Sequence, residues 1–428
     1  MMRILHIAQR YFPARGGAEI YFGEISAYLA AQGHEITVAT TDALDFETFW
    51  NPHRRRVAEH EGNLSNVRIL RFPIHHLPLP SIAYPGIRRL LWLLSMVRPL
   101  PVVIAARLSR FTPWVPGLWR WLQATQESFD LIAGMNICFE PLIEAGLCFA
   151  QRRKIPFVIY PLTHLGAGVK PGTDALGRFY TMRHQIDLVL RSHALVAQTQ
   201  TERDFYVHHG MPPGQALIAG PGIHPETILG GDAQAFRQRY NIPATSPLVL
   251  ALSAMAYDKG TVHVVEAVRR LWEQGRNIEL VLAGALLTPF QHYLERLPTT
   301  IRERIRVLGP VSEAEKRNAL AATDIFAMPS RTDSFGIVYL EAWLYQKPVI
   351  GARTWGVTDV ISDGKDGYLV PFGDVAALAD TIALLADNSE VRTTMGIAGQ
   401  QKVYAQHTWK HKHALIHQLY LDLAKNTL

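Results

Sequence analysis

Short apolar runs alternate with longer mixed segments along the chain of 428 residues. Uninterrupted apolar runs of this length are typical of strands covered on both faces, and most of the intervening segments are long enough for helices. This alternation predicts a parallel sheet with helices on both faces. The first series of runs covers residues 3–8, 35–40, 67–72, 130–133, 157–160, 195–198 and 217–219.

The pattern changes near Gly222, passes through a loop-like stretch at 225–231, and then starts again. Two successive series predict an α/β protein with two Rossmann-like domains, over residues 1–222 and 223–410. The length agrees with this, because one hydrophobic core rarely organises more than about 250–300 residues. The second series covers residues 248–253, 279–284, 306–309, 325–328, 349–351 and 368–370.

Residues 324–351 have the pattern of a strand, a polar loop, a helix and a second strand. Backbone N–H groups at a helix N-terminus lack partners within the helix and carry partial positive charge. Such an end can hold an anion, for example a diphosphate, without a basic side chain. The sequence places this N-terminus at Phe335, Gly336, Ile337 and Val338, where the glycine would allow close approach.

Two acidic residues flank this N-terminus, Asp333 just before it and Glu341 two turns along one helix face. Glu341 lies two turns away from the helix N-terminus that would hold a phosphate. A carboxylate at that distance suits vicinal hydroxyls, such as those of a ribose, better than a phosphate. Asp333 would then lie nearer to a sugar. The alternative is an Asp favoured by the helix dipole and a Glu on a solvated face.

The stretch PSRTDSFGIVYLEAWLYQKPVIGA resembles the signature of glycosyltransferase family 4, the retaining group 1 enzymes with the GT-B fold. The family has a Glu at the position of Asp333. The stretch GGAEIYFGEISAYLAAQGHEITVAT, which begins at Gly16, is similar to the first βαβ unit of the family. The resemblance implies two Rossmann-like domains facing a central cleft, with a last helix at 411–428 that packs on the first domain.

The resemblance also implies roles for residues outside the signature. Lys259 would bind the donor diphosphate as a point charge, although a lysine in a loop is by itself as well explained by solvation. His164 would contact the donor sugar, whereas its context alone fits a hydrogen-bonded loop histidine. Gly16 and Gly17 would face the cleft near the donor phosphates and the acceptor, and a tight turn alone would also need glycine.

One basic residue of the family pattern is missing. The family has an arginine at the position of Ala254, so a bidentate phosphate ligand is absent. Arg331, in the signature loop, is the nearest cation in sequence that could replace it. The alternative for Arg331 is a loop arginine facing solvent.

These features lead to a functional hypothesis, namely a hexosyl- or other glycosyltransferase that uses a nucleoside-diphosphate sugar. The acceptor would be a carbohydrate or lipid-linked hydroxyl, as in cell-surface polysaccharide or glycolipid synthesis. Two alternatives are a nucleotide-sugar-binding subunit without turnover and a GT-B-fold epimerase. The resemblance implies no cofactor and no metal, and no histidine pair has carboxylates or cysteines at ligand spacing.

Residues 87–122 are rich in Trp, Leu and Arg and carry no acid. Arginines and prolines interrupt them too often for one helix to span a bilayer. They could lie in a membrane interface with Trp92, Trp114, Trp119 and Trp121 at headgroup depth. The alternative is a set of amphipathic core helices with snorkelling arginines.

The net charge of +6 and the pI near 9.2 suit phosphorylated ligands or an anionic membrane surface. Nucleic acid is not expected, because no zinc spacing, recognition-helix pattern or basic aromatic motif is present. The first residues, MMRILHIAQRYF, lack a signal region, and two cysteines fit a reducing compartment. We therefore expect a cytoplasmic protein, with peripheral contact at the inner face of the plasma membrane as an option.

Overall fold

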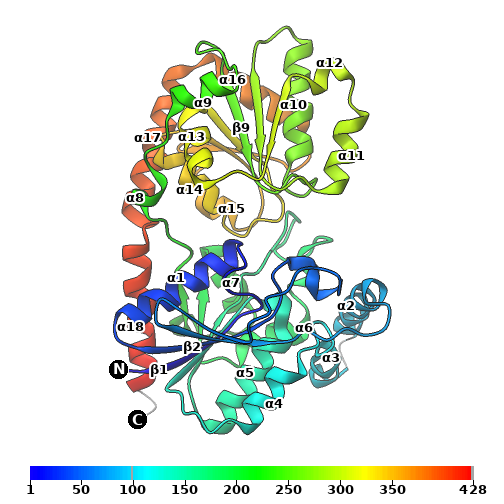
Figure 1. The fold of residues 1–428 in the computed structure, drawn as a ribbon, viewed down its shortest axis with the longest axis vertical. Helices are drawn as coiled ribbons and strands as arrows, with labels where there is room; N and C mark the ends of the chain where they lie inside the picture. Colours follow the sequence, from blue (N-terminus) through cyan, green and yellow to red (C-terminus); the bar gives the residue numbers. More distant parts are fainter. Residues whose placement is uncertain (98–99, 426–428) are drawn as a thin grey trace. The chain divides into compact units, whose positions relative to one another are not determined.

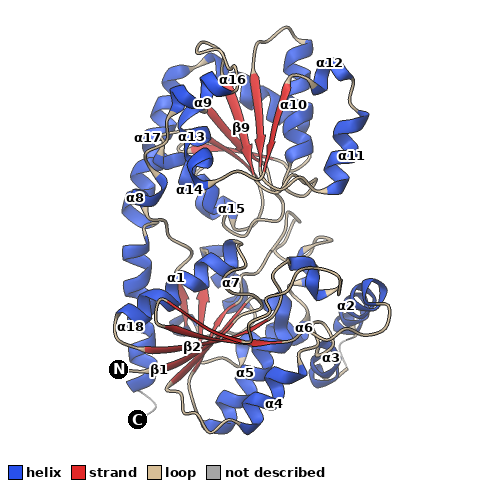
Figure 2. Cartoon of the chain, viewed as in Figure 1, coloured by secondary structure: helices blue, strands red, loops and turns tan. Residues whose placement is uncertain are grey.

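The computed structural model describes residues 1–97 and 100–425, and they form two compact units. The first unit contains Met1–Leu165, Pro171–Gly220 and Lys412–Leu428. The second contains Gly166–Lys170 and Pro221–His411. In each unit, helices cover both faces of a largely parallel sheet (Figures 1 and 2).

The first sheet has the strand order β3-β4-β2-β1-β5-β6-β7-β8. All neighbours are parallel except β3 and β4. The strands are β1 (Arg3–Ile7), β2 (Glu35–Thr41), β3 (Glu61–Leu64), β4 (Val67–Phe72), β5 (Leu131–Met135), β6 (Phe157–Tyr160), β7 (Ala194–Ala197) and β8 (Ala216–Ile218).

Most helices of the first unit connect these strands and bury their apolar faces against them. The buried core beneath them is continuous, with Leu5, Ile132 and Phe157 fully buried at its centre. The helices are α1 (Gly17–Ala31), α2 (Pro80–Met96), α3 (Val102–Ser109), α4 (Pro116–Ala124), α5 (Glu140–Arg153), α6 (Arg183–Leu190), α7 (Gln200–His208) and, from Lys412 onward, α18 (Trp409–Lys425).

The second sheet has the order β11-β10-β9-β12-β13-β14, and all its pairings are parallel. Its strands are β9 (Leu248–Leu252), β10 (Glu279–Ala283), β11 (Ile305–Gly309), β12 (Ile325–Met328), β13 (Val349–Ala352) and β14 (Gly367–Val370). Its helices are α8 (Pro225–Ile228), α9 (Ala233–Arg239), α10 (Thr261–Glu273), α11 (Thr288–Arg296), α12 (Thr299–Arg302), α13 (Glu313–Ala322), α14 (Ile337–Leu344), α15 (Val357–Val360), α16 (Val375–Asp387) and α17 (Ser389–Gln406).

The predicted fold class is confirmed, and each predicted strand is found within two residues of its predicted limits. Two elements were missed. β3 is a polar edge strand that pairs antiparallel to β4 without an apolar run to announce it. The stretch at 225–231, expected as loop, contains the short helix α8.

One segment departs from the predicted domain division. Residues 166–170 were expected in the first domain, but they belong to the second unit. Trp355 holds them there, since its backbone N–H donates to the carbonyl of Gly166 at 2.9 Å and its indole Nε1 to that of Gly168 at 2.8 Å. Local sequence gives no sign of a contact between residues so far apart in the chain.

The last helix returns to the first unit, where Figure 1 shows α18 beside the β1 end of the sheet. A chain of neutral hydrogen bonds fixes it. The hydroxyl of Tyr160 donates to that of Tyr420 at 3.0 Å, and Tyr420 lies 3.3 Å from His6 Nε2. His6 Nδ1 in turn is 2.8 Å from Ser26 Oγ, which donates to the carbonyl of Phe22. The terminal residues 426–428 of the predicted helix lie outside the described residues.

Residues 87–122 fall on α2, α3 and α4, with residues 98 and 99 outside the described part. For the four tryptophans, the structure favours the alternative of core helices over a position at headgroup depth. Each is half-buried, and Trp119 and Trp121 pack on the core of the first unit. Among the helices of the described residues, none is both long and apolar enough to cross a bilayer.

Candidate functional site

The second sheet has a topological switch point between its neighbouring strands β9 and β12. From β9 the chain first builds one side of the sheet, through β10 and β11, and then crosses to the other side through β12. In open α/β sheets the loops after the two strands at such a point diverge and leave a crevice for ligands. Here these loops are residues 253–260 and 329–336, which carry Lys259, Arg331, Asp333 and Gly336.

Close backbone contacts hold the two loops together. The backbone N–H of Arg331 donates to the carbonyl of Asp258 at 2.9 Å. Gly260 has φ +78°, and a Cβ there would lie 2.3 Å from the carbonyl oxygen of Pro329. Only glycine allows both the left-handed conformation and this approach. The relative position of the side chains on the two loops is therefore set by backbone packing.

The predicted anion-binding N-terminus is present at the start of α14. Gly336 is its N-cap, with φ +82°, and a Cβ there would meet the Tyr339 ring at 2.4 Å. The side chain of Phe335 is buried, and those of Ile337 and Val338 pack on the core. Residues 335–338 can thus offer a ligand their backbone groups, which is the role the sequence suggested.

Lys259 and Asp333 form an ion pair just before this helix. Lys259 Nζ lies 2.8 Å from Asp333 Oδ2, and the two side chains are 27% and 20% exposed. The cation predicted for a diphosphate and the carboxylate predicted for a sugar are therefore in direct contact. Both can exchange this contact for a ligand without crossing the site.

Arg331 is held against the neighbouring loop 253–260 and against Phe372. Its Nε donates to Asp258 Oδ1 at 2.7 Å, and its guanidinium lies 5.1 Å from the centre of the Phe372 ring and 5.7 Å from that of Tyr257. Arg331 is therefore ion-paired, with 35% of its side chain exposed, and its role as a phosphate ligand stays a prediction. Its charge is shared with Asp258, so it is a weaker substitute for the cation missing at Ala254 than a free arginine would be.

Glu341 is buried, with 7% of its surface exposed, so the alternative of a solvated helix face is wrong. Its Oε1 accepts a hydrogen bond from Lys316 Nζ at 2.9 Å, but no partner for Oε2 is found among the described residues. Burial raises the pKa of Glu341, and Lys316 opposes that shift. A buried carboxylate oxygen without a donor is costly, and ligand hydroxyls would satisfy it.

The sequence did not predict Lys316. It lies on α13 and bridges Glu341 and Glu313, at 2.9 and 2.8 Å. Burial disfavours its charge, but attraction by these carboxylates outweighs burial and raises the pKa of Lys316. No local spacing could have indicated the pair of Lys316 with Glu341, because these two residues lie on two helices separated by a strand.

The first sheet has its own switch point, between β1 and β5, and the loop after β1 leads to Gly16 and Gly17. The two glycines differ. A Cβ on Gly16 would lie 2.3 Å from Glu19 Oε2, whereas a Cβ on Gly17 would meet nothing within 4 Å. Glu19 is buried and accepts from Arg10 Nε at 2.9 Å. A side chain at Gly16 would thus displace the carboxylate of this ion pair, whereas open space lies beside Gly17.

His164 follows β6, and its position is fixed through the residue before it. The backbone N–H groups of Thr163 and Gln198 donate to the two oxygens of buried Glu202, at 2.6 and 2.7 Å. The His164 ring is edge-on to the ring of Tyr180, with 4.7 Å between centroids. Glu202 was not predicted, since its role depends on a loop 39 positions away in the chain.

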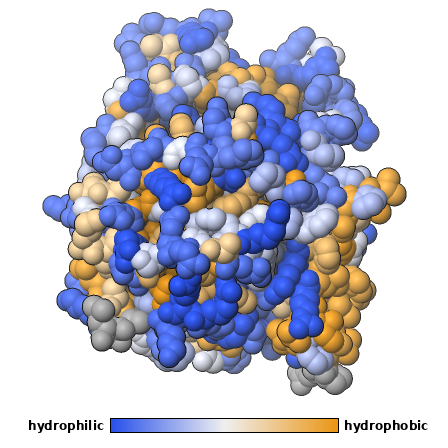
Figure 3. Space-filling model, turned by 60° about the horizontal axis from the view of Figure 1, so that its bottom comes forward, coloured by the Kyte–Doolittle hydropathy of each residue, from blue (hydrophilic) through white to orange (hydrophobic). Residues whose placement is uncertain are grey.

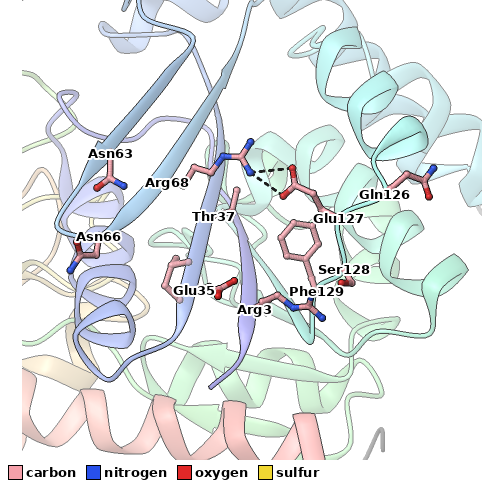
Figure 4. Close-up of a pocket in the computed structure, with 11 residues that line it drawn as sticks. Arg3, Glu35, Thr37, Asn63, Asn66, Arg68, Gln126, Glu127, Ser128 and Phe129 are labelled. Carbon is pink, nitrogen blue, oxygen red and sulfur yellow. Dashed lines mark hydrogen bonds and ion pairs between the residues drawn. The ribbon is translucent and has the colours of Figure 1, made fainter.

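A cavity of about 470 Å³ lies where the strands of the first sheet begin (Figure 4). Arg3 and Glu35, the first residues of β1 and β2, line it, and so do Arg68 and Glu127, which form an ion pair at 3.0 Å. The predicted site residues of the first unit, Gly16, Gly17 and His164, follow the carboxyl ends of β1 and β6 instead. This cavity therefore contributes nothing to the site described above.

Two family models together match most of the chain. The model of glycosyl transferases group 1 matches residues 232–402, and that of the glycosyl transferase 4-like domain matches residues 16–222. A D-inositol 3-phosphate glycosyltransferase of Xylanimonas cellulosilytica is 31% identical, with 66% of this chain and 70% of that protein aligned. The chain belongs to the group 1 glycosyltransferases.

A second group 1 relative aligns less completely. The D-inositol 3-phosphate glycosyltransferase of Corynebacterium glutamicum strain R is 30% identical over 56% of this chain, and the alignment spans 59% of that enzyme's length. The solved structure of HepE from Anabaena in complex with UDP superposes with a TM-score of 0.71 at 19% identity, covering 98% of this chain and all of that one. At this identity the likeness concerns the fold, which is GT-B.

The group 1 assignment leaves the predicted roles of individual residues as hypotheses. Among residues 1–97 and 100–425, no group of three or more His, Cys, Asp or Glu side chains could hold a metal ion. The cations near the switch point of the second unit are Lys259 and Arg331, each paired with an aspartate. Any anionic ligand here would have to compete with, or rearrange, these pairs.

Proposed function

We propose that the protein is a retaining glycosyltransferase that moves a sugar from a nucleoside-diphosphate sugar to a carbohydrate or lipid-linked hydroxyl. One observation carries the proposal. The buried carboxylate of Glu341 has one oxygen that no described residue hydrogen-bonds, on the helix whose N-terminus follows the Lys259–Asp333 pair. This arrangement matches the hydroxyl, phosphate and sugar parts of such a donor.

The donor is assigned as follows. Glu341 Oε2 accepts from the ribose hydroxyls, while the backbone at 335–338 and Lys259 Nζ bind the diphosphate. Asp333, released from Lys259, accepts from sugar hydroxyls. HepE, which shares the fold, has been solved with UDP and with UDP-glucose, which supports a nucleotide sugar as donor.

The acceptor side is assigned to the first unit. Gly17 leaves room for a substrate next to the backbone, and His164 contacts the transferred sugar. In the reaction, the bond between the anomeric carbon and the phosphate oxygen breaks as the acceptor oxygen bonds to that carbon from the same face. The leaving phosphate takes the acceptor proton. Neither a protein nucleophile nor a metal takes part, so catalysis comes from positioning and from stabilising the leaving diphosphate.

We place this activity in cell-surface polysaccharide or glycolipid synthesis, in the cytoplasm and with peripheral contact at an anionic membrane. The charge of +6 supports this placement.

A nucleotide-sugar-binding subunit without turnover is the second candidate. Two observations favour it, namely the absence of a cation at Ala254 and the pairing of Lys259 with Asp333. Incubating the protein with a panel of nucleotide sugars, with and without lipid extract, separates the two functions. A transferase releases nucleoside diphosphate and labels an acceptor, whereas a binding subunit shows calorimetric binding without release. Failure to bind any nucleotide sugar contradicts both.

A further inference from the structure

The hairpin of α2 and α3 exposes a continuous set of large apolar side chains. They are 39–71% exposed, and Figure 3 shows hydrophobic colour gathered on this side of the first unit, at the right of the view. We name this surface the α2–α3 patch. It consists of Leu79, Ile82, Leu90, Leu93, Met96, Val97, Val103, Ile104 and Phe111.

Along α2, the exposed residues Ile82, Leu90 and Leu93 follow helical spacing, and exposed Met96 and Val97 lie at the end of the helix. The opposite face of the same helix is buried, where Leu91 packs with Ala105 of α3 and with Met182. α2 is therefore apolar on both faces, although only one of them has a protein partner among the described residues. An apolar surface of this extent on a water-soluble unit usually marks an interaction site.

The patch belongs to a region without acidic residues, since no Asp or Glu occurs between Glu61 and Glu127. Arginines recur throughout this stretch, and Arg89 and Arg107 are exposed on α2 and α3. Apolar side chains beside arginines, without any acid, fit a surface that is both apolar and anionic. A second copy of this chain fits poorly, because a symmetric contact would bring the same arginines together.

The hairpin is fixed to the first unit before any partner binds. Buried Arg88 of α2 lies 2.5 Å from Glu140 Oε1, which also pairs with His184 Nε2 at 3.0 Å. The backbone N–H of Arg183 donates to Ser95 Oγ at 2.8 Å. The patch is thus a preformed face, and docking needs no folding of the hairpin.

We propose that the α2–α3 patch is the surface by which this protein docks on a bilayer that contains anionic phospholipid. The apolar side chains enter the headgroup boundary, and Arg89 and Arg107 contact lipid phosphates. The biological meaning rests on the proposed function, because docking brings the enzyme to a lipid-linked acceptor. The docking itself is a separate property that can be measured without any substrate.

Cosedimentation of the full chain with vesicles tests the proposal. We expect binding to vesicles of phosphatidylcholine mixed with phosphatidylglycerol, weaker binding to pure phosphatidylcholine, and a loss of the difference as salt is raised. The triple substitution Leu90→Ser, Leu93→Ser and Met96→Ser should weaken binding about tenfold to a hundredfold. The matched control is Leu384→Ser, Tyr404→Ser and Leu415→Ser, which are similarly exposed on α16, α17 and α18 and should bind like the parent.

The contribution of the two exposed arginines to vesicle binding is tested with two double variants. Arg89→Gln with Arg107→Gln should reduce binding at low salt and not at high salt, whereas Arg270→Gln with Arg296→Gln, exposed on α10 and α11, should change neither. An equal loss of vesicle binding in both double variants would mean that the net charge of the protein, and not the patch, attracts it to the vesicles. That result would overturn the proposal.

Three further outcomes contradict the docking surface. They are absence of binding to the mixed vesicles, unchanged binding of the triple variant, and sedimentation of the parent alone as a dimer that the triple variant abolishes. Release of nucleoside diphosphate from a donor, measured without vesicles, separates this result from the proposed function. Binding to vesicles without release of nucleoside diphosphate would support the docking surface and contradict the transferase function. Release of nucleoside diphosphate without binding to vesicles would support the transferase function and contradict the docking surface.

Discussion

The first unit fixes its last helix through a buried chain of uncharged hydrogen-bonded side chains, separate from its buried ion pairs such as Arg88–Glu140, whereas the second unit places paired charges after its strand ends. In the first, Tyr160, Tyr420, His6 and Ser26 are fully or almost fully buried and neutral, and burial lowers the pKa of His6 to about 3. In the second, Lys259 and Arg331 pair with aspartates and stay partly exposed.

The difference separates structural from ligand-facing polar groups within two similar folds. A neutral chain in which each hydroxyl and ring nitrogen has a partner costs little to bury, and it specifies which helix packs where. Ion pairs at the sheet edge are less strongly held and can exchange their partners for a charged ligand. Changes in the first set should therefore affect stability, and changes in the second should affect ligand binding.

The largest expected effect is on donor binding, in Glu341→Gln. The substitution keeps an acceptor for Lys316 but removes the charge that would bind two hydroxyls, so affinity for a nucleoside diphosphate should fall about tenfold to a hundredfold, or about 1.5–3 kcal/mol. Isothermal calorimetry measures it. Glu313→Gln, the other and more exposed partner of Lys316, is the control and should change little. Equal affinity in Glu341→Gln would remove the ribose role.

Next comes Tyr420→Phe, which should destabilise α18 by about 1–3 kcal/mol, since it leaves His6 Nε2 buried without a donor. Hydrogen exchange in peptides from α18 should rise, while donor affinity stays unchanged. Tyr404→Phe, an exposed tyrosine on α17, is the control for the lost hydroxyl. If Tyr420→Phe lowered donor affinity without changing hydrogen exchange in α18, the hydrogen-bond chain of the first unit would have a role in ligand binding and not in stability.

A smaller effect is expected in Arg331→Ala. Because Asp258 shares the charge of this arginine, nucleoside diphosphate affinity should fall only about threefold to tenfold, and adding Ala254→Arg should recover part of it. Parent-like affinity in Arg331→Ala would show that Lys259 and the α14 N-terminus suffice.

The smallest effect concerns pH. Burial lowers the pKa of His6, His34 and His417 below the ordinary 6.5, and for His34 the neighbouring His417, at 2.8 Å, adds to the shift. The unfolded chain therefore takes up protons first. The stability that the neutral rings provide is complete above pH 6.5 and is lost as the pH falls below it.

Urea unfolding followed at pH values on both sides of 6.5 checks this expectation. The double variant His34→Gln with His417→Gln should reduce the pH dependence, since it removes two of the histidines whose pKa burial lowers. An unchanged slope in this variant would assign the effect to other residues.

The sequence alone determined the two sheets, because each central strand is an apolar run that must be covered on both faces. It also determined the glycine-led start of α14, since Gly336 stands where a polar loop meets a helical pattern. β3 was not predicted, because an edge strand can pair through its backbone without an apolar run. Lys259 was predicted only through the family resemblance, and Asp333 from its place just before the helix N-terminus, and their roles stay predictions.

Only the tertiary structure decided which polar groups meet and which helix faces stay exposed. Lys316 reaches Glu341 because α13 and α14 pack on the same sheet, and no pattern within either helix encodes that pairing. Arg88 and Arg89 are neighbours in one apolar sequence, yet the first is buried and the second exposed. The reason is that Glu140, on α5, lies opposite Arg88 and balances a charge that could not otherwise be buried.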